Sequence, residues 1–213
     1  MTNETAHKPG LVLHAAATYD FLIWLTTLGR EQTFRERMLR LAHLRTGESV
    51  LDVGCGTGSL AIAAKRQVGP TGTVCGLDAS PEMIAQAEKK AKKAGAEVGF
   101  KQAFAQSLPV PDAQFDVVLS TIMLHHLPKK ARAELAAEIR RVLKPFGRVL
   151  AIDFGRTARD KKGFFDHFHR RHGDVEFKEI LALLEGAGLN IAESGAVGMR
   201  DLEFVLATLP SGA

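Results

Sequence analysis

The sequence has little cysteine and few aromatic residues other than phenylalanine, and the shortage of cysteine excludes two classes of protein. Its two cysteines, Cys55 and Cys75, form no CxxC pair and no cluster with metal-ligand spacing. A disulfide scaffold and a cysteine-built metal centre are therefore not expected, and a reduced, cytoplasmic setting is. The chain has one tryptophan and one tyrosine, but 46% of its 213 residues are hydrophobic, which is enough for a sizeable core.

Long hydrophobic runs are also missing. The first ten residues are polar and lack the apolar stretch of a signal peptide. The longest apolar run near them, residues 19–29 (YDFLIWLTTLG), is about half of the ~20 residues that a bilayer-spanning helix needs. We therefore expect no transmembrane segment. Since no internal repeat or low-complexity stretch is evident either, the length favours one domain with appendages.

The charge that is present is unevenly placed. The formal net charge is +4, and residues 155–173 (GRTARDKKGFFDHFHRRHG) hold six Lys or Arg against two Asp. This segment is either a solvated loop or a basic lid-like insertion, and a lid would favour an anionic acceptor or one held at an anionic membrane surface. Nucleic acid is a less favoured partner, because the basic residues are confined to this one segment. The sequence does not indicate an oligomeric state.

Apolar, strand-like segments alternate with helical ones after residue 45. The expected strands are residues 49–54, 73–78, 98–104, 115–120, 148–154, 189–197 and 202–209, and the expected helices are residues 59–69, 80–95, 129–145 and 174–188. This alternation predicts a Rossmann-like α/β fold, with a seven-stranded, mostly parallel sheet and helices on both faces. Residues 1–45 are expected to form an N-terminal helical cap on the main domain, residues 46–213.

Three glycines, Gly54, Gly56 and Gly58, follow the first expected strand where a helix begins. Glycines there let a ligand approach the backbone, and the helix N-terminus offers N–H donors; a tight turn that serves only the fold is the alternative. Asp78 ends the second strand, where an acid can accept hydrogen bonds from ribose hydroxyls. Because Ser80 already supplies a helix cap, a capping role for Asp78 is weakened. A nucleoside ligand is therefore favoured, and the G-x-G-x-G spacing differs from the G-x-G-x-x-G of dinucleotide sites.

Four motifs now support a resemblance to a known family. They are VLDVGCGTG, GLDAS, LPVPDAQFDVVLS and RVLKPFGRVLAIDF, and together they cover about residues 46–155. In this order they resemble the class I methyltransferases that use S-adenosylmethionine, closest to the branch with the ubiquinone and menaquinone C-methyltransferases. The resemblance implies S-adenosylmethionine as cofactor, no metal, and methyl transfer to a small molecule such as a phenolic, quinol-like or lipid-like acceptor.

The resemblance also implies which residues contact the cofactor. Gly54 and Gly56 would pass against its methionine portion, and Asp78 would hold both ribose hydroxyls. The other implied contacts are Asp52, Thr57, Gly58, Ala79, Met83, Phe104, Ala105 and Thr121. Phe104 departs from the family, which usually has Asp or Asn there to accept a hydrogen bond from the adenine amino group. The turn LKPFGR departs from LKPGGR, and we expect its Phe146 to pack.

Candidate groups on the acceptor side are few. His125 follows the fourth strand and could act as a base, because histidine titrates near neutral pH; Asp153 ends the fifth strand and could orient a substrate hydroxyl. Tyr19 and Asp20 resemble the YD segment that precedes the first strand in the quinone methyltransferases, which implies a substrate-side role. The alternative for each is a turn or packing role. For the whole chain, the alternatives are a non-catalytic nucleoside-binding sensor or scaffold and an NAD-dependent oxidoreductase.

Overall fold

The computed structural model of the chain describes residues 31–154, 177–199 and 201–210. Tyr19 and Asp20, most of the expected N-terminal cap and the basic segment 155–173 lie outside these residues. Their expected roles therefore stay predictions.

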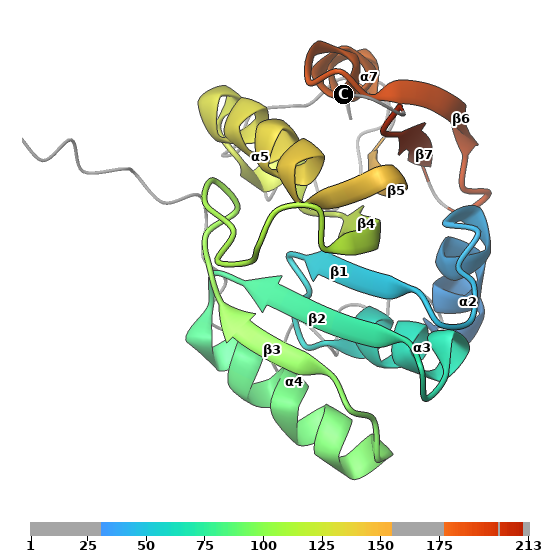
Figure 1. Ribbon diagram of the computed structural model, residues 1–213, viewed down its shortest axis with the longest axis vertical. Coiled ribbons are helices and arrows are strands. Elements are labelled where there is room, and N and C mark those ends of the chain that lie inside the picture. The colour runs from blue at the N-terminus through green and yellow to red at the C-terminus, as the bar shows by residue number, and fades with distance from the viewer. Residues whose placement is uncertain (1–30, 155–176, 200, 211–213) are drawn as a thin grey trace, which may run out of the picture.

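Seven strands form a single sheet in the order β3-β2-β1-β4-β5-β7-β6 (Figure 1). The strands are β1 (Ser49–Val53), β2 (Thr73–Asp78), β3 (Gly99–Gln102), β4 (Phe115–Thr121), β5 (Leu143–Phe154), β6 (Asn190–Ala196) and β7 (Leu202–Thr208). The first five are parallel, whereas β7 runs antiparallel between β5 and β6. The predicted α/β fold with a mostly parallel, seven-stranded sheet is confirmed.

Helices cover both faces of the sheet because the strands bury apolar residues on both sides. The helices are α2 (Glu31–Leu41), α3 (Ser59–Val68), α4 (Pro81–Ala94), the 3-10 turn η1 (Leu124–His126), α5 (Lys129–Val142) and α7 (Phe177–Gly186). On one face, Leu135 and Ile139 of α5 pack in one cluster with Ile180 and Leu184 of α7. On the other face the core includes residues of α2 and α3. Each helix therefore contributes an apolar stripe, as amphipathic spacing predicts.

Local signals set several helix ends where they were expected. The hydroxyl of Ser80 accepts a hydrogen bond from the backbone N–H of Met83 at 3.2 Å and caps α4, and Pro81 opens its first turn. Gly95 ends the same helix in the left-handed conformation, with φ 61°. These residues determine where α4 begins, directly after β2, and where it ends.

The junction between α5 and β5 differs from the prediction. The helix ends at Val142 and the strand already begins at Leu143, whereas the sequence predicts a helix up to Pro145. The pairing with β4 shifts along this stretch, which produces an irregularity in the ladder. Proline has no N–H for a helix or a regular ladder, so the chain bends here instead. Phe146, at φ 65°, is 73% exposed, and the expectation that it packs is therefore wrong.

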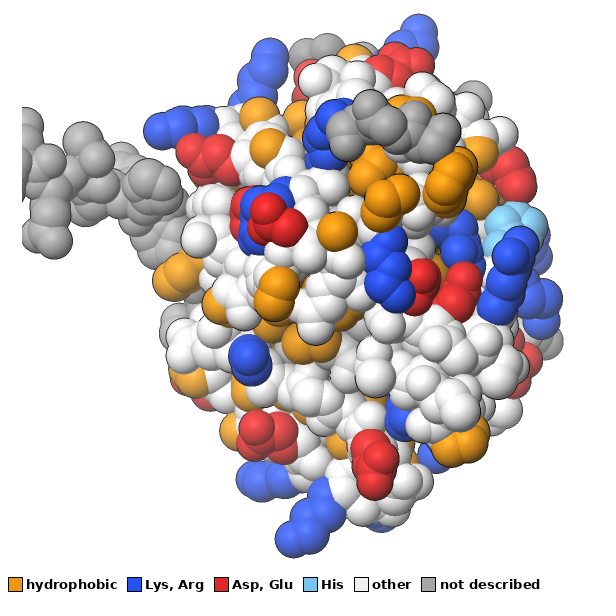
Figure 2. Space-filling model, in the orientation of Figure 1, with side chains coloured by type: hydrophobic (Ala, Val, Ile, Leu, Met, Phe, Trp, Pro, Cys, Tyr) orange, Lys and Arg blue, Asp and Glu red, His pale blue; other side chains and the backbone are white. Residues whose placement is uncertain are grey.

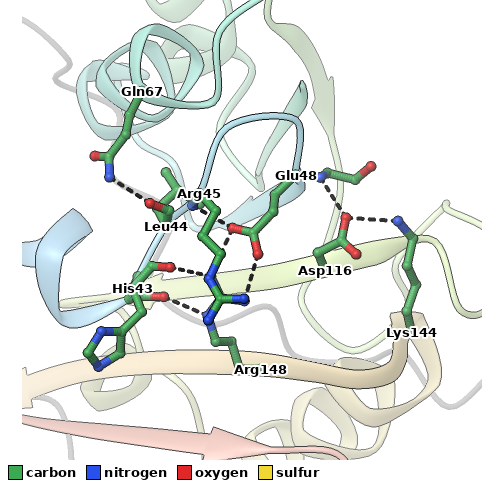
Figure 3. Close-up of polar contacts among 10 residues, drawn as sticks. His43, Leu44, Arg45, Glu48, Gln67, Asp116, Lys144 and Arg148 are labelled. Carbon is green, nitrogen blue, oxygen red and sulfur yellow. Dashed lines mark hydrogen bonds and ion pairs between the residues drawn. The ribbon is translucent and has the colours of Figure 1, made fainter. Parts of the chain in front are cut away.

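A polar network joins α2 to the edge of the sheet opposite the glycine loop (Figure 3). The guanidinium of Arg148 on β5 donates to the backbone carbonyls of Ala42 and His43, both at 2.7 Å. It also donates two hydrogen bonds of 2.8 Å to the carboxylate of Glu48, which lies just before β1. This bidentate pair satisfies carbonyls at the end of α2 and fixes that helix to two strands.

The carboxyl ends of β1, β2 and β3 meet at one edge, where their arrowheads point in Figure 1. In open α/β sheets ligands bind beyond these ends, near the point where the strand order reverses. Here the order reverses between β1 and β4. The face drawn in Figure 2 carries basic and acidic side chains interspersed. Among the described residues, the helices are all too short or too polar to cross a membrane.

Candidate functional site

The glycine loop after β1 uses the left-handed conformation at Gly54, Gly56 and Gly58, with φ of 75°, 52° and 76°. The reasons for glycine differ along the loop. A Cβ on Gly58 would lie 2.7 Å from a ring carbon of Phe100, so packing requires glycine there. A Cβ on Gly54 would lie 2.6 Å from Cγ of Met123, on the side where the sheet edge is hollowed. The loop therefore serves both the fold and an open site.

Asp78 holds this loop in place. Its Oδ2 accepts a hydrogen bond from the backbone N–H of Gly56, and its Oδ1 accepts one from Ser80, both at 2.9 Å. Burial raises the pKa of Asp78, although these backbone hydrogen bonds act in the opposite direction. Each carboxylate oxygen has two lone pairs, so both can accept a further donor from a ligand.

A hollow that is partly open to solvent lies beyond the ends of β1, β2 and β4. Seven of the residues that the sequence predicts for cofactor binding line it: Gly54, Gly56, Asp78, Ala79, Met83, Phe104 and Ala105. The hollow is also lined by nine residues that the sequence did not predict for cofactor binding: Val53, Leu77, Ala103, Gln106, Leu108, Ile122, Met123, His126 and Leu127. Most of these nine are apolar and carry no chemical signature in the sequence.

Four predicted cofactor residues do not line the hollow, namely Asp52, Thr57, Gly58 and Thr121. The hydroxyl of Thr57 accepts a 2.7 Å hydrogen bond from Nζ of Lys90, which ties the loop to α4. Thr121 ends β4, and the next two residues reach the hollow instead. Asp52 is buried directly behind the loop, on β1.

The turn after β4 has an unusual backbone. Ile122 has φ 53°, and a β-branched residue rarely adopts the left-handed region. Its N–H donates to the carbonyl of Ile152 at 2.7 Å, which anchors the turn to β5. The turn places the side chain of Met123 over Gly54. Strained backbone of this kind is concentrated at functional sites, because the surrounding structure must hold it.

The carboxyl group of Asp52 is the most perturbed acid near the site. Its side chain is 1% exposed, and neither oxygen has a donor in full hydrogen-bond geometry among the described residues. Burial, and then the charge of Asp78, raise the pKa of Asp52 to about 7, while the backbone of Ala61 lowers it. Burial also raises the pKa of the neighbouring Cys55 thiol, so this thiol stays protonated. The region behind the loop therefore favours a positive charge nearby.

His125 and Asp153 form a pair at the same edge of the sheet. Nδ1 of His125 lies 2.7 Å from Oδ1 of Asp153, and the backbone N–H of His125 donates to Oδ2 at 3.1 Å. The carboxylate is 1% exposed and the imidazole 14%. Asp153 therefore fixes the orientation of the ring and favours the proton on Nδ1, so that Nε2 is the nitrogen that can accept a proton. The next ring, His126, lies 3.9 Å away between centroids and lines the hollow.

Within the described part of the chain, no three His, Cys, Asp or Glu side chains come together in a way that could hold a metal ion. The described residues at this edge of the sheet offer acids, histidines and backbone N–H donors. Asp78 and apolar residues line the hollow, and the His125–Asp153 pair lies at the same edge of the sheet.

Comparisons with known proteins agree with this geometry. Residues 50–147 match the family model described as a methyltransferase domain. The demethylmenaquinone methyltransferase of Lactobacillus johnsonii is 36% identical over 153 residues, which are 70% of this chain and 62% of that protein. The ubiquinone/menaquinone biosynthesis C-methyltransferase UbiE of Cupriavidus metallidurans is 32% identical over 165 residues, 77% of this chain and 67% of that protein.

A second UbiE, from Bordetella avium, is 33% identical, and the match covers 78% of this chain and 64% of that protein. The chain thus spans a little under two thirds of the length of this UbiE and of the L. johnsonii enzyme. Among solved structures, a SAM-dependent methyltransferase from Aquifex aeolicus superposes with a TM-score of 0.75. It is 26% identical, and the match covers 91% of this chain and 98% of that one.

Proposed function

The chain belongs to the class I S-adenosylmethionine-dependent methyltransferases, and from this premise we propose that it methylates a small hydroxylated aromatic molecule, with His125 as the base. S-adenosylmethionine is its methyl donor. The observation that carries the proposal is the 2.7 Å contact between His125 and Asp153 at the edge of the sheet where the glycine loop and Asp78 also lie.

The residues that line the hollow fit the proposed donor. Asp78 can accept hydrogen bonds from the two ribose hydroxyls through lone pairs that its backbone donors leave. Ala79 and Met83 offer apolar contact to a base, and Gly54 lets the methionine portion approach the backbone. The carboxyl group of Asp52 is buried behind the loop, where its negative charge would favour a cationic ligand.

The bound donor supplies an electrophilic methyl group on a positively charged sulfur. The protein then has to hold the acceptor in line with the carbon–sulfur bond and exclude water, which is catalysis by proximity. His125 would take the proton of the acceptor's hydroxyl on Nε2, and Asp153 would stabilise the imidazolium that forms. Loss of that proton raises the electron density of the oxygen and of the ring carbons beside it. One base can therefore serve either O- or C-methylation.

The relatives support an aromatic acceptor. The names of the two kinds of relative mention demethylmenaquinone and ubiquinone or menaquinone biosynthesis. A quinol is a ring with acidic hydroxyls, and a positioned histidine base can take a proton from such a hydroxyl. The apolar wall formed by Ile122, Met123 and Leu127 is compatible with a flat, poorly hydrated ring beside the donor.

The test incubates the purified chain with S-adenosylmethionine and hydroxylated benzenes and naphthalenes, including 1,4-dihydroxynaphthalene under reducing conditions. Mass spectrometry then follows the methylated acceptor and S-adenosylhomocysteine together. We expect methyl transfer by the unchanged chain and much slower transfer by Asp78→Ala at the same concentration of S-adenosylmethionine. Cofactor binding without transfer to any hydroxylated aromatic would overturn the acceptor class and favour a nucleoside-binding sensor. NADH serves as the control ligand, which an NAD-dependent oxidoreductase would bind.

A further inference from the structure

Gln106, in the loop after β3, has a feature that the methyl transfer does not explain. Its Oε1 is buried and has no hydrogen-bond partner among the described residues. Gln106 is one of the residues that line the hollow, next to Phe104 and Ala105. An amide oxygen that is removed from water without a partner costs about 1–3 kcal/mol, and native proteins seldom leave one so. A ligand donor in the hollow would satisfy it.

The order of residues along the hollow indicates which part of the ligand lies here. Asp78, at the end of β2, is the carboxylate among the described side chains that line the hollow, and a ribose diol is the group that suits it. With the methionine portion at the glycine loop, the base lies beyond Asp78, toward Met83 and the stretch from Phe104 to Gln106. Adenine carries one exocyclic donor, its 6-amino group. Phe104 has no atom that could accept a hydrogen bond from it.

We propose that Oε1 of Gln106 accepts a hydrogen bond from the 6-amino group of adenine and so selects adenosyl ligands in this chain. The inference rests on the proposed use of the hollow for the nucleoside. Gln106 would thus accept the hydrogen bond that an Asp or Asn at the position of Phe104 usually accepts in the family. Phe104, 49% exposed at the rim, would cover the face of the base.

The loop that carries Gln106 is held from behind by α5. The N–H of Leu108 donates to Glu138 at 2.7 Å, and the carbonyl of Leu108 accepts from Arg141 at 3.0 Å. Arg141 also donates to the carbonyl of Val110 at 2.9 Å. The side chains of Glu138 and Arg141 thus form hydrogen bonds with both N–H and carbonyl groups of the loop backbone. Gln106 is therefore positioned before a ligand arrives, and less ordering entropy is lost on binding.

The test compares two ligands by calorimetric titration of the full chain. One is S-adenosylhomocysteine, and the other is its analogue with hydrogen in place of the 6-amino group. We expect the unchanged chain to bind the amino form about 3- to 10-fold more tightly, the value of one neutral hydrogen bond. Gln106→Leu should lose this preference and bind the two ligands equally. Gln106→Glu, which can only accept, should keep the preference or increase it. Gln114→Leu, at an exposed position before β4, is the matched control and should behave as the unchanged chain.

The outcomes separate this inference from the proposed function. Failure of the unchanged chain to bind S-adenosylhomocysteine would overturn both. Tight binding with the same preference for the amino form in Gln106→Leu would overturn the role of Gln106 alone. Equal weakening of both ligands in Gln106→Glu would also overturn it, because the amide would then donate to a ring nitrogen instead. Circular dichroism and thermal unfolding of each variant confirm that a loss of binding is not a loss of folding.

Discussion

The backbone N–H of Gly56 donates to Oδ2 of Asp78 across 2.9 Å, so the glycine loop of β1 and the acid of β2 form one unit before any ligand is bound. Oδ1 of the same carboxylate accepts the N–H of Ser80, at the N-terminus of α4. Asp78 therefore links two strands and a helix at the edge where the hollow opens. A change at Asp78 should alter both the ligand contacts and the shape of the loop.

We expect Asp78→Ala to weaken the binding of S-adenosylhomocysteine by about 10- to 100-fold, because a hydrogen bond to a charged acceptor contributes about 1.5–3 kcal/mol. Asp78→Asn should lose less, since its carbonyl oxygen can still accept from the loop or from one hydroxyl. Calorimetric titration measures both affinities. Glu97→Gln, an exposed acid at the opposite edge of the sheet, is the control. Equal affinity of Asp78→Ala and the unchanged chain would remove Asp78 from the site.

His125→Ala should lower the turnover of a methyl acceptor by about 100- to 10,000-fold, the usual contribution of a positioned base. Asp153→Asn should lower kcat as well, because an amide no longer favours the proton on Nδ1. Neither variant should change the affinity for S-adenosylhomocysteine, since neither residue lines the hollow. His43→Gln, an exposed histidine paired with Glu193, is the matched control. A loss of cofactor affinity equal to the loss of turnover would indicate a structural role for the pair.

The sequence predicted the fold well because its signals are local. Apolar strands, the cap at Ser80 and the glycine at Gly95 each act through residues within one turn or one strand. The sequence also predicted that Gly54 and Asp78 lie at the same edge of the sheet, since parallel strands end on the same side. These features need only the order of elements and the periodicity of the chain.

Contacts that depend on a particular turn could not be predicted. Met123 reaches Gly54 only because Ile122 adopts a left-handed backbone, which its β-branched side chain disfavours. The hydrogen bond between His125 and Asp153 joins the 3-10 turn η1 to the end of β5, and the sequence indicated their shared edge but not their contact. Gln106 gave no signal, because an unpartnered oxygen becomes visible only when its surroundings are known.

Arg148 should contribute more to stability than an ordinary surface residue. Its guanidinium and the Glu48 carboxylate are 13% and 14% exposed and form two hydrogen bonds, and the same guanidinium also binds two carbonyls after α2. We expect Arg148→Ala to lower the free energy of unfolding by about 3 kcal/mol, the loss when one partner of a buried pair is removed. Arg148→Lys should restore only part of this free energy, because an ammonium group cannot form the two parallel hydrogen bonds that a guanidinium forms with a carboxylate.

Chemical unfolding measures these free energies, and Lys144→Ala is the matched control. Lys144 also pairs with an acid of a neighbouring strand, Asp116, but its side chain is 39% exposed. An exposed pair of this kind contributes at most about 1 kcal/mol. Equal losses in Arg148→Ala and Lys144→Ala would contradict a special role for Arg148 among the contacts in Figure 3.

Asp52 should make the protein less stable as the pH rises. Its pKa is about 7 in the folded state against 3.8 for the ordinary group, with burial as the main cause, so the folded state binds a proton that the unfolded state has lost. The free energy of unfolding should therefore fall between about pH 4 and pH 7 through this group. The whole effect is on the order of 4 kcal/mol at most, because one pKa unit corresponds to about 1.4 kcal/mol.

Asp52→Asn carries no charge at any pH, so it should be more stable than the unchanged chain at pH 8 and should lack this fall. Unfolding by urea at pH 5 and pH 8 measures the difference. Asp116→Asn is the contrast: burial acts to raise the pKa of Asp116, but hydrogen bonds from Lys144 and the backbone of Ser49 lower it overall. Asp116 therefore stabilises the fold above its unfolded pKa and should leave the slope between pH 5 and pH 8 unchanged. The same slope in Asp52→Asn as in the unchanged chain would show that another group takes up the proton.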